Sequence, residues 1–348
     1  MNELLQDILA IISVVLNGLP QGLLALSFGF ASIPTAFAFF TGAIGNAVTG
    51  CVAPISYQAE TITYAGTAGK NKEERVSMIF YGAMIMALIG LFGLLTKVVD
   101  FIGPNIAAGM MAGVGLILAK AAVDMFKNDK IIGAVSGISA VIVYSFTQNL
   151  VYTITVSVIL SCIVGRYIKG ENNFIVVEKE KIERQKLTMN ARVLRGALGM
   201  VCLNIGSNIS FGAITGSMAN TEVNIDHLSV ISSVADMVSS FFGGSPIESI
   251  ISATGSAPHA LWSGIAMMVI MGLILIFGLL PKIGKYVPTA SISGFLLVLG
   301  LMVTVPSNAA SAVAGNPMVG GITMGVTAIS DPFLGMLAGI VARFIFGA

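Results

Sequence analysis

Residues 243–255 have the sequence GGSPIESIISATG, which places Pro246 and Glu248 inside a chain otherwise suited to a lipid bilayer. Ser245-Pro246-Ile247-Glu248 has the S-x-x-E pattern of a capping box, with proline at the first helical position, where its missing N–H costs nothing. The pattern therefore predicts a helix that begins at membrane depth. The irregular backbone expected at Gly243-Gly244 is tolerated there only if it is buried in protein or lines a wet cavity.

The composition of the whole chain indicates an integral membrane protein. Of its 348 residues, 55% are hydrophobic and 10% are charged, and the mean hydropathy is +0.91. So much apolar surface exceeds what one soluble core can bury. The net charge of +1 argues against a nucleic-acid partner. The three scattered cysteines lack the spacing of a metal site, so we expect no metal and no cofactor in this multi-pass protein of the cell (inner) membrane.

Hydropathic segments predict about 14 transmembrane segments, at about 20 residues for a full span. The expected full spans are 8–29, 35–51, 76–98, 104–125, 131–148, 151–168, 193–214, 227–243, 258–280, 287–305, 310–327 and 331–347. Two remaining stretches, 52–69 and 244–256, are too short and too polar to cross the membrane alone. They are the expected incomplete segments.

These two stretches hold corresponding positions in the two halves of the chain. Each carries Pro-Ile, then Glu, Ile, Ala and Gly, although the first has four extra residues before its glutamate. Paired short segments interrupted by glycine and proline indicate a transporter site near the midplane, between inverted repeats. We therefore predict an all-α fold of two inverted seven-segment repeats, residues 1–168 and 193–348, joined by a charged loop at 169–192.

Polar side chains around these stretches are candidate binding groups. An ionisable group at bilayer depth is costly, so Glu60 and Glu248 are candidates for coupling to a proton or sodium ion, although Glu248 has a structural alternative as a capping partner. Amides donate and accept, which suits the edge of a heterocycle, and interhelical hydrogen bonding is the alternative for the asparagines. A tyrosine can stack on such a ring. The predicted substrate-binding set is Tyr57, Gln58, Glu60, Asn204, Asn208, Ser245, Glu248, Ser249 and Ser252. Asp236 is expected to form structural hydrogen bonds.

Four stretches resemble the xanthine/uracil permeases of the nucleobase cation symporter family, which includes nucleobase-ascorbate transporters. QGLLALSFGFASIP (21–34) resembles the family's first span, GPNIAAGMMAGVGLILAKAA (103–122) its fifth, FFGGSPIESIISATG (241–255) the entry to its tenth, and VPTASISGFLLVLGLM (287–302) its twelfth. The resemblance implies a core domain and a gate domain, with substrate held between short strand-plus-helix elements as segments 3 and 10. It also implies ion-coupled alternating access and a homodimer.

The chain departs from that family at three positions. The tenth-span carboxylate of the family aligns with Ser252, one helical turn after Glu248; the eighth span has Asn204 and Asn208 but no acid; and Gly22 stands where the family has histidine. The main prediction is a secondary transporter for a nucleobase, either a purine such as xanthine, guanine or hypoxanthine, or uracil. The alternative is a small-anion carrier or channel of the same fold, because two helix N-termini suit an anion.

Basic residues predict the orientation. All but Lys97 and Arg343 of the 18 lysines and arginines fall after the predicted third, fifth, seventh and eleventh segments. The positive-inside rule therefore places both termini outside, opposite to the arrangement that the family resemblance implies.

Overall fold

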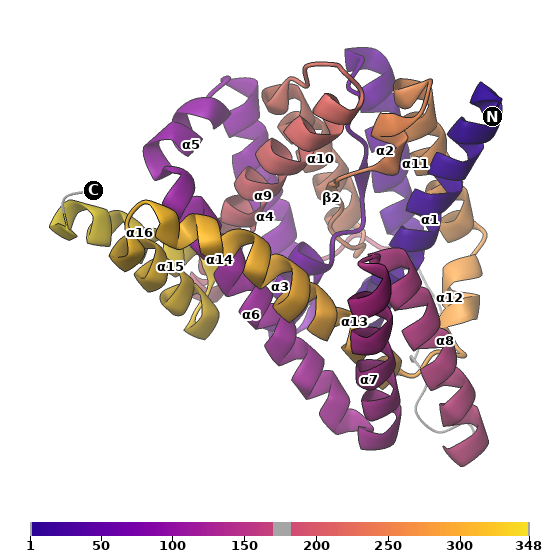
Figure 1. Ribbon diagram of the computed structural model, residues 1–348. Helices are drawn as coiled ribbons and strands as arrows, with labels where there is room; N and C mark the ends of the chain where they lie inside the picture. The colour runs from indigo at the N-terminus through magenta and orange to yellow at the C-terminus, as the bar shows by residue number, and fades with distance from the viewer. Residues whose placement is uncertain (1, 170–181, 347–348) are drawn as a thin grey trace. The chain divides into compact units, whose positions relative to one another are not determined.

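The computed structural model describes residues 2–169 and 182–346 (Figure 1). Residues 170–181 of the predicted connecting loop lie outside the described residues. The regular secondary structure of the described residues is helical apart from two strands of two residues each. Within it, seven helices are long and apolar enough to cross a membrane by length and composition. The chain is thus a multi-pass membrane protein.

Two compact units divide the chain. Unit 1 comprises Met1–Leu95 and Val177–Ile283, and unit 2 comprises Thr96–Val176 and Gly284–Ala348. Each unit combines segments from both halves of the sequence. The units therefore cut across the predicted repeats at 1–168 and 193–348, whose inverted relation stays a prediction.

Unit 1 holds both short strands. Its elements are α1 (Glu3–Ser27), α2 (Ser32–Thr49), β1 (Ile55–Ser56), α3 (Ala59–Ala68), α4 (Lys72–Leu91), α9 (Ala191–Met218), α10 (Ile225–Phe241), β2 (Glu248–Ser249), the 3₁₀ helix η1 (Ala253–Ser256) and α11 (Ala260–Ile276), with α12 (Leu279–Gly284) at its boundary. Helix α10 packs against α4 and α2, and α11 packs against α2 and α1. The strands and α3 are shorter than any span, so the helices around them must bury them.

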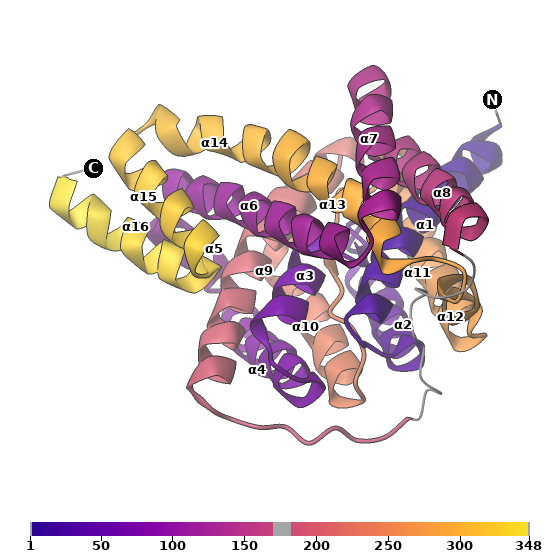
Figure 2. The same ribbon diagram turned by 90° about the horizontal axis from the view of Figure 1, so that it is seen from below.

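Unit 2 is built on α6. Its elements are α5 (Leu95–Ile102, from the boundary onward), α6 (Pro104–Asn128), α7 (Lys130–Thr147), α8 (Leu150–Lys169), η2 (Thr289–Ile292), α13 (Ser293–Val298), the π-helical turn η3 (Leu299–Thr304), α14 (Val305–Ala314), α15 (Pro317–Ile329) and α16 (Pro332–Phe346). Helix α6 lies along α14 and α15 (Figure 2). Helix α7 packs against α8 and α13.

Two predicted span boundaries are wrong. The expected span 76–98 is broken at Gly93, which has a φ of +61° and separates α4 from α5. The expected break near Pro306 does not occur, because the helix continues through it to Ala314 after the π-helical turn of η3. A π turn widens the helix locally and so accommodates a proline that cannot donate a hydrogen bond. The break comes instead at Gly315-Asn316, where the Asn316 side chain caps α15.

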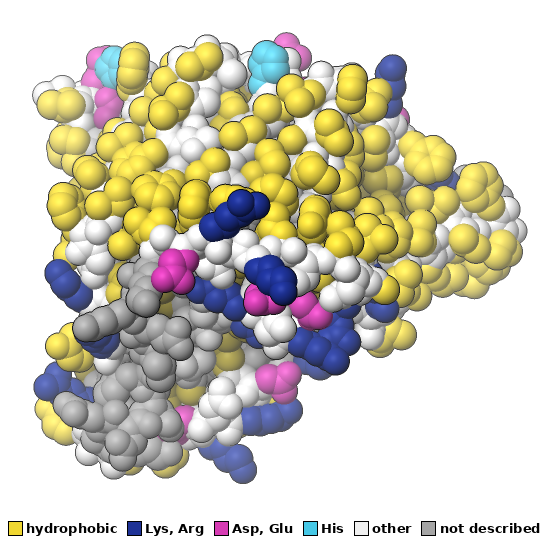
Figure 3. Space-filling view, turned by 180° about the vertical axis from the view of Figure 1, so that it is seen from behind, with side chains coloured by type: hydrophobic (Ala, Val, Ile, Leu, Met, Phe, Trp, Pro, Cys, Tyr) yellow, Lys and Arg dark blue, Asp and Glu magenta, His cyan; other side chains and the backbone are white. Residues whose placement is uncertain are grey.

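Basic side chains gather at one end of unit 1. The Arg192 guanidinium of α9 lies 3.9 Å from the Glu74 carboxylate of α4, and the Arg184 guanidinium lies 5.0 Å from the centre of the Phe241 ring, at the end of α10. Most of the lysine and arginine side chains visible on this face lie in the lower half of the view in Figure 3, and hydrophobic side chains predominate in the upper half. This asymmetry is the one on which the predicted orientation rests, and the orientation itself stays a prediction.

A carboxylate that sequence analysis did not single out joins α1 to α11. Asp7 is 8% exposed. Its carboxylate accepts hydrogen bonds from the His259 backbone N–H and from the Ser263 hydroxyl, both at 3.0 Å, and lies 2.8 Å from Nδ1 of the His259 ring. The side-chain hydrogen bond to Asp7, aided by the charges of Asp7 and Glu3, raises the pKa of His259 from its usual value.

We expect the His259 contribution to stability to fade with rising pH. Because the folded-state pKa lies above that of the unfolded chain, about 6.5, the stabilisation is complete below that value and disappears as the pH passes through the raised pKa. The melting temperatures of the wild type and His259→Gln should be measured in detergent from pH 5 to 9. The difference between them should be largest at acidic pH and should disappear at alkaline pH. In an Asp7→Asn background the difference should not vary with pH; a variation there would contradict the assignment.

Candidate functional site

The candidate site begins where β1 and β2 pair inside unit 1. The strands are antiparallel, with Ile55 opposite Ser249 and Ser56 opposite Glu248. This pairing brings together two segments almost 200 residues apart, which are the two stretches that were too polar to cross the membrane alone. Every predicted substrate-binding residue lies in unit 1 and is at most 9% exposed.

The predicted helix at Pro246 is wrong. Residues 245–247 are extended because their backbone groups are bound from outside the segment: Ser245 N–H donates to Thr35 Oγ1 at 2.9 Å and Ile247 N–H donates to Asp236 Oδ1 at 2.7 Å. The Ser245 hydroxyl donates to the Pro246 carbonyl at 3.1 Å. The S-x-x-E pattern is a local signal, and tertiary hydrogen bonds and the pairing with β1 override it.

Thr35 is the anchor of this extended segment. It is fully buried, and its hydroxyl donates to the Ala31 carbonyl at 2.7 Å while accepting from Ser245 N–H. We expect Thr35→Val to lower the unfolding free energy by roughly 1–3 kcal/mol, since a buried N–H loses its acceptor. Thr41→Val is the matched control, because Thr41 makes only the bond to its own helix, at 2.8 Å to Phe37. Equal melting temperatures of the two variants would contradict this role of Thr35.

Segment 3 has the predicted strand-plus-helix form, and segment 10 has it only in part. After β1, α3 runs from Ala59 to Ala68, and its N-cap Gln58 makes no side-chain capping bond. After β2 the chain forms only the four-residue η1, capped by Ser252, which accepts from Thr254 N–H at 3.2 Å. A single turn of 3₁₀ helix has no useful dipole. The prediction that two helix N-termini form an anion site is therefore wrong for the second half of the chain, where no α-helix directly follows β2.

Glu248 is the most deeply buried acid of the site, with no exposed surface. Asp236, Asn204 and Ser232 are the polar side chains around it. None of the described residues lies in hydrogen-bonding geometry with either Glu248 carboxylate oxygen. Two neighbouring acids, 0% and 1% exposed, would repel each other strongly if both were charged and uncompensated. This pair needs a cation or a proton.

Further buried oxygen atoms of these segments also lack partners among the described residues. They include Oδ1 of Asn204, Oδ1 of Asn208 and Oγ of Ser249. The amide nitrogen of Asn208 is used, donating to Ser229 at 3.2 Å and Ser232 at 3.4 Å. The interhelical role expected for asparagine is thus confirmed for that amide nitrogen. The arrangement leaves acceptors unused, and acceptors are the groups that hold a hard cation.

Asp236 is the residue whose importance sequence analysis underestimated. Its hydrogen bond to Ile247 N–H confirms the expected structural role, but its position beside Glu248 adds an electrostatic one. The sequence around Asp236 does not indicate that Glu248 lies beside it, because this contact depends on tertiary packing.

Gly22 and Tyr57 explain one departure from the permease pattern. A Cβ atom on Gly22 would lie 2.8 Å from the Tyr57 ring, so a histidine at this position would displace the tyrosine. Tyr57 also meets Phe39 edge to face, with ring centroids 5.4 Å apart, and is 2% exposed. The structure places Tyr57 in the packing of unit 1, and stacking on a substrate stays a prediction, as do the binding roles of Gln58 and Glu60.

Comparison with known proteins gives the class of fold. No protein-family model matches the chain, and no curated protein matches its sequence. Among solved structures, the transmembrane domain of the cyanobacterial bicarbonate transporter BicA superposes with a TM-score of 0.70 at 14% identity, covering 99% of this chain and 98% of that one. SLC26A9 superposes with a TM-score of 0.70 at 13% identity, over 98% of this chain and 65% of that one.

Murine solute carrier 26 family member A9, an anion transporter in the inward-facing state, superposes with a TM-score of 0.70 at 14% identity, over 99% of this chain and 68% of that one. The chain thus spans about two thirds of these longer proteins. At such identities the likeness shows the fold: this chain has the transmembrane fold of solute carrier 26 transporters over its whole length. The predicted fold class is confirmed in this coarser form, and the fold is one found in proteins described as a bicarbonate transporter and an anion transporter.

Proposed function

We propose that this protein is a secondary transporter that moves a small anion across the membrane, coupled to a monovalent cation. The observation that carries the proposal is the superposition of nearly the whole chain on the transmembrane domain of a bicarbonate transporter. The anion alternative is therefore preferred to the nucleobase that the sequence resemblance suggested.

The N-terminus of α3 is the proposed anion contact. Its first N–H groups have no acceptors inside the helix, and the partial positive charge there favours an anion. Gln58 adds an amide nitrogen that lacks an acceptor among the described residues. The strand pairing sets this terminus two residues beyond Ser56, which is opposite Glu248. Anion and acid pair thus belong to one small region of unit 1.

Glu248 and Asp236 are the proposed cation site, with Asn204 and Ser232 beside them. The carboxylate oxygen atoms of the two acids are ligands that sodium and other hard cations prefer. A proton shared by the two carboxyl groups would compensate the same charge. In either form the cation neutralises the negative potential that would otherwise repel an anion at α3, so binding of one favours binding of the other.

Ligand-dependent thermal stabilisation of the purified protein tests the proposal. Bicarbonate, sulfate, chloride and dicarboxylates should be compared with xanthine, guanine, hypoxanthine and uracil, each with sodium and with a bulky organic cation in its place. We expect one anion to raise the melting temperature, because a ligand stabilises the state that it binds, and sodium or low pH to strengthen its effect. Stabilisation by a nucleobase and by no anion would overturn the anion assignment and restore the nucleobase prediction.

A further inference from the structure

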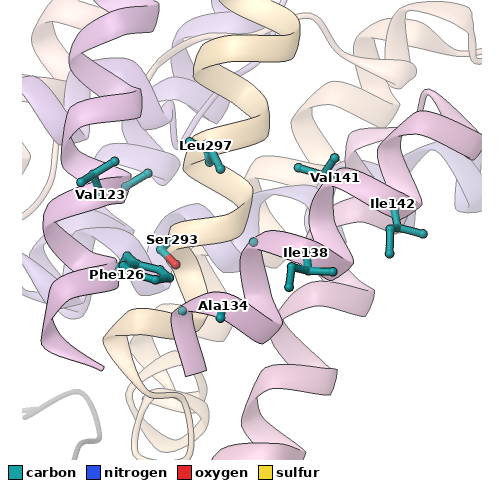
Figure 4. A pocket seen from close by; sticks show the side chains of 11 residues that line it. Val123, Phe126, Ala134, Ile138, Val141, Ile142, Ser293 and Leu297 are labelled. Atoms are coloured by element: carbon teal, nitrogen blue, oxygen red, sulfur yellow. The ribbon is translucent and has the colours of Figure 1, made fainter. Parts of the chain in front are cut away.

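A second cavity lies in unit 2, on its apolar surface. A groove of about 540 Å³ runs between α6, α7 and α13 (Figure 4). Val123 and Phe126 of α6, Ile138 and Val141 of α7, and Leu297 of α13 line it. Its one polar side chain, Ser293, already donates its hydroxyl to the Ala290 carbonyl at 2.7 Å. The lining therefore suits an apolar group, such as a hydrocarbon chain, that forms no hydrogen bonds.

The groove is open on the side where α6 and α7 face out of the unit. Val123 is 46% exposed and Ile138 is 63% exposed, and both helices are long and apolar enough to span a membrane. Exposed apolar side chains on such helices face hydrocarbon, so a lipid chain is the ligand at highest local concentration. A volume of this size lies in the range of pockets that hold small molecules.

The positive charge of Lys130 favours a ligand that also carries a negative group. It occupies the first position of α7, and Ala134, Gly137, Ile138 and Val141 follow it on the same helical face, at spacings of four, seven, eight and eleven residues. Lys127 is already paired with Asp124 at 2.8 Å, whereas Lys130 is exposed and has no ion-pair partner among the described residues. An ammonium group at the end of an apolar groove in a spanning helix matches a lipid phosphate above an acyl chain.

We propose that this groove binds one anionic phospholipid, with an acyl chain between α6, α7 and α13 and the phosphate at Lys130. The site is independent of the proposed transport site in unit 1. By filling the space between α6, α7 and α13, the lipid would stabilise unit 2.

Gly137 allows a direct test. A Cβ atom on Gly137 would meet nothing within 4 Å, and the residue lines the groove, so Gly137→Leu adds a side chain at the lipid's position. Gly325→Leu is the matched control, because Gly325 lies in α15 of the same unit and its Cβ would also meet nothing within 4 Å. Lys130→Gln tests the charge, with Lys127→Gln as its control.

The measurement is native mass spectrometry and thermal unfolding of the full chain in detergent, titrated with phosphatidylglycerol or phosphatidylcholine. For the wild type, Gly325→Leu and Lys127→Gln, we expect one retained phosphatidylglycerol and a higher melting temperature. For Gly137→Leu the apparent affinity should fall at least about tenfold, or 1.4 kcal/mol, and Lys130→Gln should respond equally to the two lipids. A wild type that prefers neither lipid, or a Gly137→Leu protein that binds like Gly325→Leu, would overturn the proposal. So would a Gly137→Leu protein that changes only its oligomeric state, since the groove would then be a protein interface.

Discussion

Glu248→Gln is expected to abolish concentrative anion uptake while leaving anion exchange intact. At one-to-one coupling, a tenfold cation gradient, about 1.4 kcal/mol, can support about tenfold accumulation of the anion. Glutamine keeps the size and the hydrogen-bonding capacity of the side chain but removes the charge that would hold the cation. The accumulation ratio should therefore fall to about one, whereas counterflow of labelled for unlabelled anion needs no net cation movement.

Three companion variants make this result specific. Asp236→Asn should behave like Glu248→Gln, because asparagine keeps the Oδ1 acceptor for Ile247 N–H and loses only the charge. Glu222→Gln, at an exposed position of unit 1, should accumulate like the wild type. Glu60→Gln separates the two coupling candidates, and a loss of accumulation there with normal accumulation in Glu248→Gln would assign coupling to the first half instead. Full accumulation by Glu248→Gln and Asp236→Asn would refute the acid-pair site.

Gly320→Ala should strongly destabilise the packing of α15 against α14. A Cβ atom on Gly320 would overlap the carbonyl oxygen of Ala312 and lie 2.5 Å from its carbonyl carbon. The obstacle is backbone of α14, which cannot rotate away as a side chain can. We expect a loss of about 2 kcal/mol or more in unfolding free energy, as for overpacked cores.

The adjacent glycine supplies the control. A Cβ atom on Gly321 would meet nothing within 4 Å, and both residues lie inside α15. Gly321→Ala should leave stability unchanged or raise it by up to about 1 kcal/mol, because alanine favours the helix more than glycine does. Thermal unfolding in detergent measures both variants, and a Gly320→Ala protein as stable as Gly321→Ala would contradict the close approach of α14 and α15.

The sequence was sufficient to predict the membrane class, the helical fold and the positions of the two short elements that pair in unit 1. Those features follow from hydropathy, which depends on each segment by itself. The strand-plus-helix form predicted for segment 3 also agrees with the structure.

What could not be predicted depends on partners far away in the chain. The helix expected at Pro246 is replaced by an extended segment because Thr35 and Asp236 bind its N–H groups, and no local pattern encodes an acceptor 210 residues away. The pairing of Asp236 with Glu248 and the link from Asp7 to His259 have the same origin. The nucleobase prediction rested on loosely matching spans, which resemble one another across transporters of a common fold because packing constrains them alike.

Uptake of a labelled anion into proteoliposomes, with and without an imposed cation gradient, tests the central claim most directly. Purified protein should be reconstituted, and the anion that stabilises it should be added outside while the sodium concentration and pH are the same on both sides. A sodium or proton gradient should then be imposed. We predict that the anion accumulates above its external concentration only when one of these gradients is present, and that Glu248→Gln equilibrates without accumulating. Equilibration of the wild type under every gradient would contradict cation coupling, and uptake of a nucleobase in place of any anion would contradict the proposed substrate class.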